Sequence, residues 1–259
     1  MKKLTISIVA YNDYEDVREA IDSIEHYTNI PKQIYIIDNS CREKVDSDRT
    51  KFQWAIAKYK DVEYVDLKRN IGFGAGHNYV LSLLDSQYHA IVNPDVILKE
   101  DVFTKLIEYM DTHLDCGMCI PKIVDEQGKI QDAYRNELTV FDMLIRYFFR
   151  PFFKKRIEKQ SLKDMDYTHD FQVPFAQGCF LLIRTNLYKK LNGFDDRFFM
   201  YMEDADLSKR VNEVDSVMYV PDCSVIHKWS QGSHKSLKLF KIHVQSMISY
   251  FNKWGWKWK

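Results

Sequence analysis

The chain has 259 residues, of which 46% are hydrophobic and 29% charged, as expected for a folded protein with one large domain or two small ones. Lys and Arg together number 37, and so do Asp and Glu, so the formal net charge is zero. A general nucleic-acid-binding protein is therefore excluded, because such proteins carry an excess of basic residues.

The N-terminal apolar segment is short and is followed at once by acids, which does not fit a signal peptide. No segment approaches the ~20 apolar residues that span a bilayer. We therefore expect a cytoplasmic protein. Its five cysteines are scattered, and Cys116 and Cys119 form a lone C-x-x-C within the apolar run CGMCIPKIV. A zinc site needs further ligands, so we expect a buried, reduced pair.

Strands and helices alternate along the first hundred residues. Apolar runs predict strands at residues 4–10, 32–38, 62–67 and 88–93. Residues 14–27 predict an amphipathic helix, because Val17, Ile21 and Ile24 recur at helical spacing, and a second helix is expected near residues 75–84. This alternation indicates βαβ units, a mainly parallel sheet and an α/β fold.

Polar residues follow several of the predicted strands. Asp38, Asn70, Asn93 and Asp95 each come just after a strand. The segment NPDVILKED, taken alone, is consistent with a turn, because Asn, Pro and Asp are common turn residues. In open parallel sheets, however, ligands bind at the carboxyl ends of the strands, so these side chains are expected to share one rim.

The segment RNIGFGAGHN is rich in glycine. Gly72, Gly74 and Gly76 are spaced G-x-G-x-G, but His77 stands where a dinucleotide-binding fingerprint needs its third glycine. The segment also follows the third strand instead of the first, which disfavours a dinucleotide oxidoreductase. Two interpretations stay open: a tight strand-to-helix connection, and a close approach of the backbone to a ligand.

An acidic cluster follows the aromatic run RFFMYM. Glu203, Asp204 and Asp206 suit a helix N-terminus, and Asp206 is spaced to pair with Arg210 one turn later. Because the cluster lies at the edge of buried structure, a carboxylate there can have a raised pKa and serve as a general base. His227 closes the strand-like run CSVIH, where a lone histidine is more often structural than a ligand.

The C-terminal tail combines basic and aromatic residues. Seven lysines and no acid occur from Lys228 onward, and apolar residues recur at helical spacing between Leu237 and Trp254. Such a helix fits a membrane interface. Packing on the domain, or on a second subunit in a homodimer, is the alternative. The segment MLIRYFFRPFFKKRIEK has a similar composition.

Seven motifs in order resemble inverting glycosyltransferases of family 2, in the bacterial rhamnosyltransferase-like branch. The resemblance covers roughly Leu4 to Ser233, and its motifs are TISIVAYN, IIDNS, RNIGFGAGHN, IVNPDV, FAQGCFLLIR, GFDDRFFMYMEDADLSKR and VIHKWSQGS. The resemblance implies a GT-A fold, with a Rossmann-like nucleotide-binding sheet covered by helices on both faces. It implies a glycosyltransferase domain at residues 1–233, divided into a donor-binding half (1–98) and an acceptor-binding half (99–233), with residues 234–259 as a separate tail.

The resemblance also implies roles for residues. Asp95, with His227, would hold Mg²⁺ or Mn²⁺ against the donor's diphosphate, although Asn93 stands in place of the first acid of the family motif. Asp204 would be the general base, and Glu203 would orient the acceptor or the base. The residues implied in donor binding are Tyr11, Asn12, Asp38, Asn70, Gly72, Gly74, Asn93 and Asp95.

The expected reaction is transfer of a sugar, with dTDP-rhamnose as a candidate donor, from a nucleotide-diphosphate sugar to a hydroxyl of a glycan. The expected acceptor is a lipid-linked glycan of the bacterial cell surface, reached from the inner face of the membrane. The alternative is a catalytically silent relative that acts as a binding or assembly partner.

Overall fold

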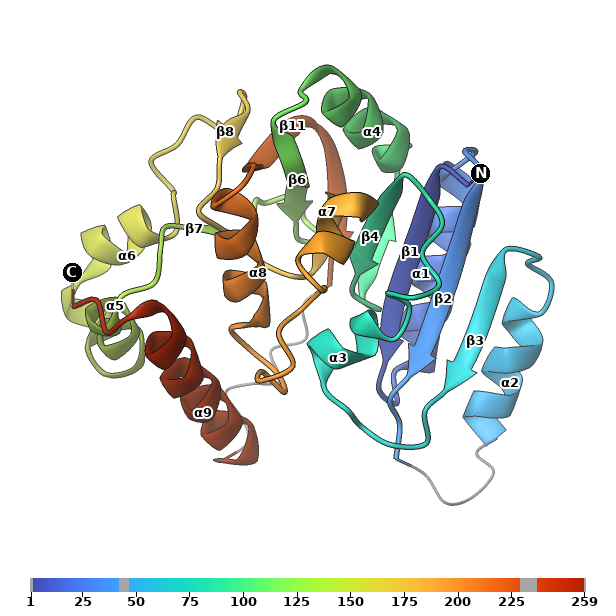
Figure 1. Ribbon diagram of the computed structural model, residues 1–259, viewed down its shortest axis with the longest axis horizontal. Helices are drawn as coiled ribbons and strands as arrows, with labels where there is room; N and C mark the ends of the chain where they lie inside the picture. The colour runs from blue at the N-terminus through green and yellow to red at the C-terminus, as the bar shows by residue number, and fades with distance from the viewer. Residues whose placement is uncertain (1, 42–46, 229–236, 259) are drawn as a thin grey trace.

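One large mixed sheet organises the protein. The computed structural model describes residues 2–41, 47–228 and 237–258. The sheet has nine strands, eight of them in the order β3-β2-β1-β4-β10-β6-β11-β5, and β8 pairs with β11. Helices lie on both faces of this sheet (Figure 1). The expected α/β architecture is confirmed.

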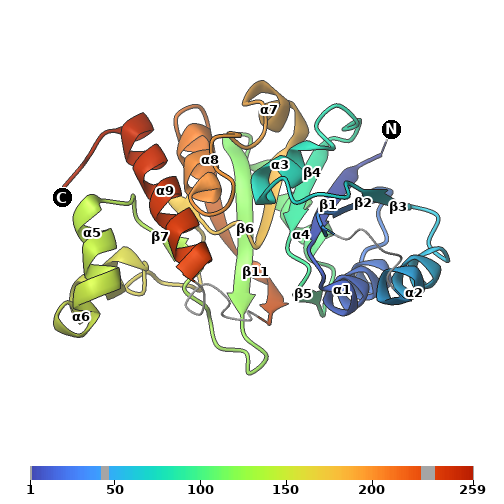
Figure 2. The same ribbon diagram turned by 90° about the horizontal axis from the view of Figure 1, so that it is seen from below.

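The N-terminal half of the sheet is wholly parallel. Its strands are β1 (Leu4–Ala10), β2 (Lys32–Asp38), β3 (Val62–Asp66) and β4 (Tyr88–Val92). β1 and β4 are buried at every position, which explains their continuous apolar sequences. Figure 2 shows α1 (Tyr14–Tyr27) and α2 (Ser47–Ile56) on one side of this half, with α3 (Phe73–Asn78) and α7 (Thr185–Lys190) on the other.

Two of these helices differ from the sequence-based expectation. No helix was predicted at α2, which buries only Phe52 and Ile56 and so lacks a marked apolar stripe. α3 ends at Asn78, whereas a helix was expected near residues 75–84. Its glycines at positions 74 and 76 are poor helix formers, and turns follow it.

The chain order creates a topological switch point beside β1. β2 pairs with one edge of β1 and β4 with the other, so the connections diverge at the carboxyl ends of β1 and β4. Ligands of open α/β sheets bind at such a switch point. Asn93 and Asp95 follow β4 directly, and Tyr11 and Asn12 follow β1.

The second half of the sheet is mixed, so the expected parallel arrangement holds only in part. β10 (Phe180–Arg184) runs antiparallel to both β4 and β6 (Cys116–Val124), and β11 (Ser216–His227) runs parallel to β6. The carboxyl ends of β4 and β11 therefore share an edge with the start of β10. The further elements are β5 (Val96–Leu98), α4 (Val102–Thr112), β7 (Tyr134–Arg135), α5 (Val140–Leu144), η1 (Ile145–Phe149), η2 (Arg150–Phe152), α6 (Lys154–Gln160), β8 (Phe171–Gln172), β9 (Phe175–Ala176) and α8 (Glu203–Asn212).

The expected C-terminal helix is present as α9 (Leu237–Trp254). Tyr250 and Phe251 on its inner face are buried in a second apolar cluster, with Leu138, Phe175 and Met202 among its members. The interpretation that this helix packs on the domain is thus confirmed for one of its faces. Among the residues that the structure describes, no helix is long and apolar enough to cross a membrane.

The cysteine prediction is also confirmed. Cys116 and Cys119 are both buried in β6, and neither forms a disulfide.

Candidate active site

A cavity of about 230 Å³ opens where the carboxyl end of β4 meets the start of α8. Asn93 lies on one wall, and its backbone N–H donates to the carbonyl oxygen of Cys179 at 2.8 Å. Glu203 and Asp204 lie on a second wall. The cavity therefore brings together Asn93, expected in donor binding, and Glu203 and Asp204, expected in catalysis, from distant parts of the sequence.

The backbone before α8 is strained. Tyr201 and Met202 have φ angles of 70° and 67°, in the left-handed region that residues other than glycine rarely adopt. Each such residue costs on the order of 1–3 kcal/mol, and surrounding packing has to hold it in place. Met202 belongs to the second apolar cluster, which supplies that packing. The result is that α8 begins abruptly, with Glu203 and Asp204 in its first turn.

The two carboxyl groups have different surroundings. Asp204 accepts hydrogen bonds from the backbone N–H groups of Gly178 (3.0 Å) and Ala205 (2.9 Å). In Glu203, Oε2 is buried and has no hydrogen-bond partner. Burial, and then the charge of Asp204, raise the pKa of Glu203 to about 8. Burial also raises the pKa of Asp204, whereas the two backbone donors lower it. Near pH 7, Glu203 is therefore neutral. Asp204, whose negative charge two backbone N–H groups stabilise, is the better candidate for the ionised carboxylate of the pair.

Asp95 and His227 meet at the same edge of the sheet. Asp95 Oδ1 lies 3.3 Å from His227 Nε2. His227 Nδ1 lies 3.0 Å from Gln131 Oε1, and Gln131 Nε2 donates to the carbonyl oxygen of His227 at 2.7 Å. A bond from Nδ1–H to Gln131 leaves the Nε2 lone pair directed towards Asp95, which is the arrangement of a metal-binding histidine.

These residues fit a divalent cation that the substrate helps to hold. No group of three His, Cys, Asp or Glu side chains suited to a metal occurs in the described part of the chain. Mg²⁺ commonly takes one or two carboxylates and completes its shell with phosphate oxygens and water. Asn93 Oδ1 is a buried oxygen that lacks a hydrogen-bond partner, so it too is available to a polar ligand at this edge.

Two further residues expected in donor binding lie close to β1. Tyr11 is half exposed, and the backbone N–H of Asn12 donates to Ser40 Oγ at 3.0 Å. Asp38 is fully buried and accepts hydrogen bonds from Tyr14 (2.7 Å), Tyr64 and the backbone of Ser40. These bonds fix the end of β2, and a contact of Asp38 with the nucleotide stays a prediction.

The glycine-rich segment packs against the protein itself. A Cβ atom at Gly72, which has a φ of 97°, would lie 2.3 Å from the carbonyl oxygen of Phe199. A Cβ at Gly74 would lie 2.8 Å from Phe194 Cβ. Asn70 Oδ1 accepts the N–H of Gly72 at 2.9 Å and so shapes the turn. The tight-connection interpretation therefore accounts for these residues, and their approach to a nucleotide stays a prediction.

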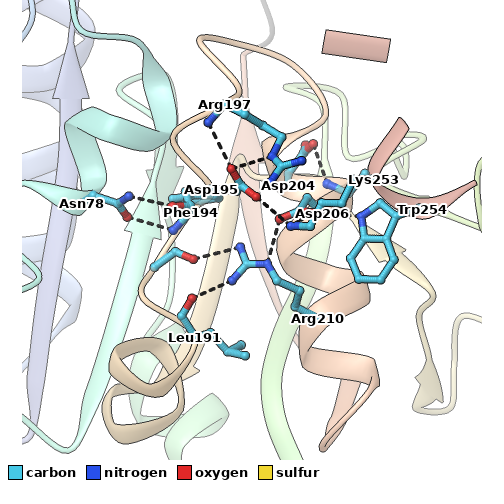
Figure 3. Close-up of polar contacts among 12 residues, drawn as sticks. Asn78, Leu191, Phe194, Asp195, Arg197, Asp204, Asp206, Arg210, Lys253 and Trp254 are labelled. Atoms are coloured by element: carbon cyan, nitrogen blue, oxygen red, sulfur yellow. Dashed lines mark hydrogen bonds and ion pairs between the residues drawn. The ribbon is translucent and has the colours of Figure 1, made fainter. Parts of the chain in front are cut away.

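An ionic network on α8 holds Asp206 (Figure 3). Asp206 is fully buried. Arg210 Nε lies 2.7 Å from its carboxylate, which confirms the expected pair. Lys253 Nζ (2.6 Å) and Trp254 Nε1 (2.9 Å), both from α9, bind its other oxygen.

The same network reaches the loop that precedes α8. Lys253 Nζ also binds Asp195 Oδ2 at 2.7 Å, and Arg210 donates to the carbonyl oxygens of Leu191 and Gly193, both at 2.9 Å. Sequence reasoning missed Lys253 and Trp254 because their lysine-rich surroundings indicated a membrane surface. It also missed Arg135 and Arg146, which line the cavity.

Comparisons with known proteins agree with this geometry. Residues 5–191 match the family model described as Glycosyl transferase family 2. The chain belongs to glycosyltransferase family 2. It is 25% identical to rhamnosyltransferase WbbL of Escherichia coli K12, over 95% of this chain and 91% of that protein. It is 23% identical to the N-acetylglucosaminyl-diphospho-decaprenol L-rhamnosyltransferase of Mycobacterium tuberculosis, over 99% of this chain and 86% of that protein.

Solved glycosyltransferase structures share the fold. GalNAc-T7 with UDP, GalNAc and Mn²⁺ superposes with a TM-score of 0.69 at 15% identity, over 98% of this chain and 50% of that chain. The chain thus spans about half the length of GalNAc-T7. The mannosyltransferase PcManGT of Pyrobaculum calidifontis, with GDP-Man and Mn²⁺, gives a TM-score of 0.66 at 13% identity, over 97% and 64% of the two chains. The GT-A fold implied by the sequence is confirmed.

The raised pKa of Glu203 predicts a pH-dependent effect on stability. The pKa rises from 4.5, its ordinary value, to about 8 in the folded protein, so the unfolded chain releases this proton at lower pH than the folded one. The contribution of Glu203 to stability is therefore present below about pH 4.5 and is lost as the pH rises towards about 8. We expect Glu203→Gln to raise the free energy of unfolding at pH 8 relative to the wild type, and to change it little at pH 4.5. Urea denaturation at both pH values measures this. An equal effect at both would contradict the raised pKa.

Proposed function

We propose that the protein catalyses the inverting transfer of a sugar from a nucleotide-diphosphate sugar to a hydroxyl of a glycan. The observation that carries this proposal is that a carboxylate suited to general-base work and Asn93, at the end of β4, line the same cavity. Asp204 has two backbone donors that stabilise its charge, and Glu203 beside it is neutral near pH 7.

In the proposed reaction, Asp204 accepts the proton of the acceptor hydroxyl as that oxygen attacks the anomeric carbon. The neutral carboxyl of Glu203 donates a hydrogen bond that orients the acceptor. A single displacement inverts the anomeric configuration and requires no protein nucleophile. Cys179 lines the cavity, but burial raises the pKa of its thiol well above the ordinary value, so it stays protonated and unreactive.

Asp95 and His227 are the residues that would hold Mg²⁺ or Mn²⁺. Asn93, which directly follows β4, has a side-chain oxygen without a hydrogen-bond partner. A divalent cation there supplies neutralisation of the negative charge that develops on the leaving diphosphate. Gln131 keeps the imidazole of His227 in the required tautomer and orientation. Tyr11, Asn12, Asp38, Asn70, Gly72 and Gly74 lie around the switch point where the nucleotide would bind.

The relatives support a finer proposal. The two relatives are named as rhamnosyltransferases, and one of them as acting on N-acetylglucosaminyl-diphospho-decaprenol. We infer that dTDP-rhamnose is a candidate donor here, and that the acceptor is a lipid-linked glycan of a bacterial cell surface. Residues 1–98 would contribute the donor side of the site and residues 99–233 the acceptor side. The enzyme would work in the cytoplasm, at the inner face of the membrane.

The outer face of α9 supports membrane docking. Leu237 and Trp258, at its start and just beyond its end, are 82% and 62% exposed. Lys238 and Lys241 on this helix are exposed as well. Apolar side chains with flanking lysines bind anionic bilayer surfaces. The inner face is occupied by the second apolar cluster, so deletion of α9 would disturb the fold and would not test docking.

Asp204→Asn is the direct test of the proposed base. Asn is nearly isosteric and cannot accept the proton, so we expect kcat to fall by at least ~100-fold while donor binding is retained. The measurement is single-turnover transfer from the donor found by screening nucleotide sugars. Near wild-type transfer by Asp204→Asn, together with an inactive Glu203→Gln, would move the base to Glu203. No transfer by the wild type from any nucleotide sugar would favour a silent binding partner.

Asp95→Ala tests the cation site. Loss of this carboxylate removes the one acidic ligand of the site, so we expect loss of turnover and of Mn²⁺-dependent nucleotide binding. Calorimetric titration of UDP, dTDP and GDP with and without Mn²⁺ measures the second effect. Full activity of the wild-type enzyme in excess EDTA is the result that excludes a catalytic cation.

Vesicle binding tests the docking face. The double variant Leu237→Ser/Trp258→Ser removes two exposed apolar side chains, each worth ~1.5–3 kcal/mol when buried, so we expect at least ~10-fold weaker binding to anionic vesicles. Trp54→Ser is the matched control, because Trp54 lies on α2 and is 79% exposed. Equal binding by the wild type and the double variant contradicts docking through α9.

A further inference from the structure

One peptide group links α9 to the start of α8. It joins Met200 to Tyr201, and its carbonyl oxygen, on Met200, accepts a hydrogen bond from Ser246 Oγ of α9 at 2.8 Å. Burial raises the pKa of Glu203, and a hydrogen bond from the backbone N–H of Tyr201 to the Glu203 carboxyl offsets part of that rise. The C=O and N–H groups of a trans peptide point in opposite directions, so Ser246 and Glu203 contact the two sides of one flat unit.

The backbone of Tyr201 does not favour this orientation by itself. Its φ angle of 70° lies in the left-handed region, which is strained for a residue with a side chain. A flip of the Met200–Tyr201 peptide would bring φ to a negative value and relieve the strain. The same flip would turn the N–H of Tyr201 away from Glu203. Contacts from outside this turn therefore have to oppose the flip.

Two side chains of α9 supply such contacts. Ser246 is only 4% exposed, so its hydroxyl has little access to water, and a flip would take away its acceptor at a cost in free energy. His243 lies three residues earlier on the same face of the helix. Its ring stacks on that of Tyr201, with centroids 4.6 Å apart and planes at 23°. One face of α9 thus fixes both the peptide and the side chain that follows it.

We propose that Ser246 is a positioning residue for the acids at the start of α8. Its hydroxyl fixes the Met200–Tyr201 peptide so that the N–H group of Tyr201 points at Glu203. Ser246 acts from outside the described lining of the cavity, through a peptide group, and touches no reacting atom. The inference rests on the proposed function only for the part that Glu203 plays in orienting the acceptor.

Several other titratable groups face Glu203 in the cavity. They are Asp204 of α8, Cys179 just before β10, Arg135 of β7, Arg146 of η1, Tyr201, and His243 of α9. The substitution Ser246→Ala changes none of them and neither adds nor removes a charge. A change in the titration of Glu203 in this variant therefore reports on the peptide that Ser246 holds.

The test is an NMR titration of the side-chain carboxyl carbon of Glu203 in the full chain, without donor or acceptor. Its resonance is the one missing from Glu203→Gln. Loss of a hydrogen-bond donor disfavours the charged form of a carboxyl group, so we expect Ser246→Ala to raise the pKa of Glu203 by ~1. Ser246→Thr keeps the hydroxyl and is expected to titrate like the wild type. Ser249→Ala makes the same change at a partly exposed position three residues later on α9, and is the matched control.

Wild-type titration of Glu203 in Ser246→Ala would overturn the inference. If this variant also had a lower free energy of unfolding, the bond to Met200 would be purely structural. An equal rise in the pKa of Glu203 in Ser246→Thr or in Ser249→Ala would overturn it too, because both variants keep a hydroxyl at position 246. If Ser246→Ala does not fold, Ser246→Cys replaces it, since a thiol is a weak donor and should also raise this pKa. The titration needs no sugar transfer, so its result is independent of whether the proposed function holds.

Discussion

The buried carboxylate of Asp206 is the constraint on which the arrangement of the site depends. A buried charge without partners is strongly destabilising, whereas a paired and hydrogen-bonded one is tolerated. Arg210 supplies one partner from the same helix, and Lys253 and Trp254 supply two from α9. Lys253 also binds Asp195. Burial alone would raise the pKa of Asp195, but hydrogen bonds from Lys253 and Arg197 outweigh burial and lower this pKa to about 2. One lysine of α9 thus joins this helix to α8 and to the loop that precedes α8.

This network explains how a short helix can begin with the adjacent acids Glu203 and Asp204 after two left-handed residues. Tyr201 and Met202 store conformational energy, and the helix that follows them is held from behind by α9. The reactive cavity therefore combines parts of the chain that are far apart in sequence. Asn93 follows β4, Glu203 and Asp204 begin α8, and α9 both supports α8 and contributes His243 to the lining of the cavity.

The sequence predicted the parts of this structure that depend on local pattern. The apolar runs placed β1, β2 and β4, and the polar residues after them marked the rim. The spacing of Asp206 and Arg210 predicted their ion pair, which is confirmed. Long-range pairing left no local signal: Lys253 lies in a lysine-rich tail, and nothing near it indicates that Asp206 is its partner. The left-handed backbone at Tyr201 and Met202 was equally hidden, because neither residue is of a type that favours it. The glycine-rich segment fitted two interpretations until its contacts with Phe194 and Phe199 were known.

Hydrogen exchange at the start of α8 tests the central claim most directly. Lys253→Met removes the charge that joins Asp206 and Asp195 while keeping an unbranched apolar side chain. Lys241→Met, at an exposed position of the same helix, is the matched control. The account predicts that amides of residues 203–206 exchange at least ~10-fold faster in Lys253→Met than in the wild type, which corresponds to about 1.4 kcal/mol of local stability, with no change in Lys241→Met. Wild-type protection of these amides in Lys253→Met would contradict the claim that α9 holds α8 in place.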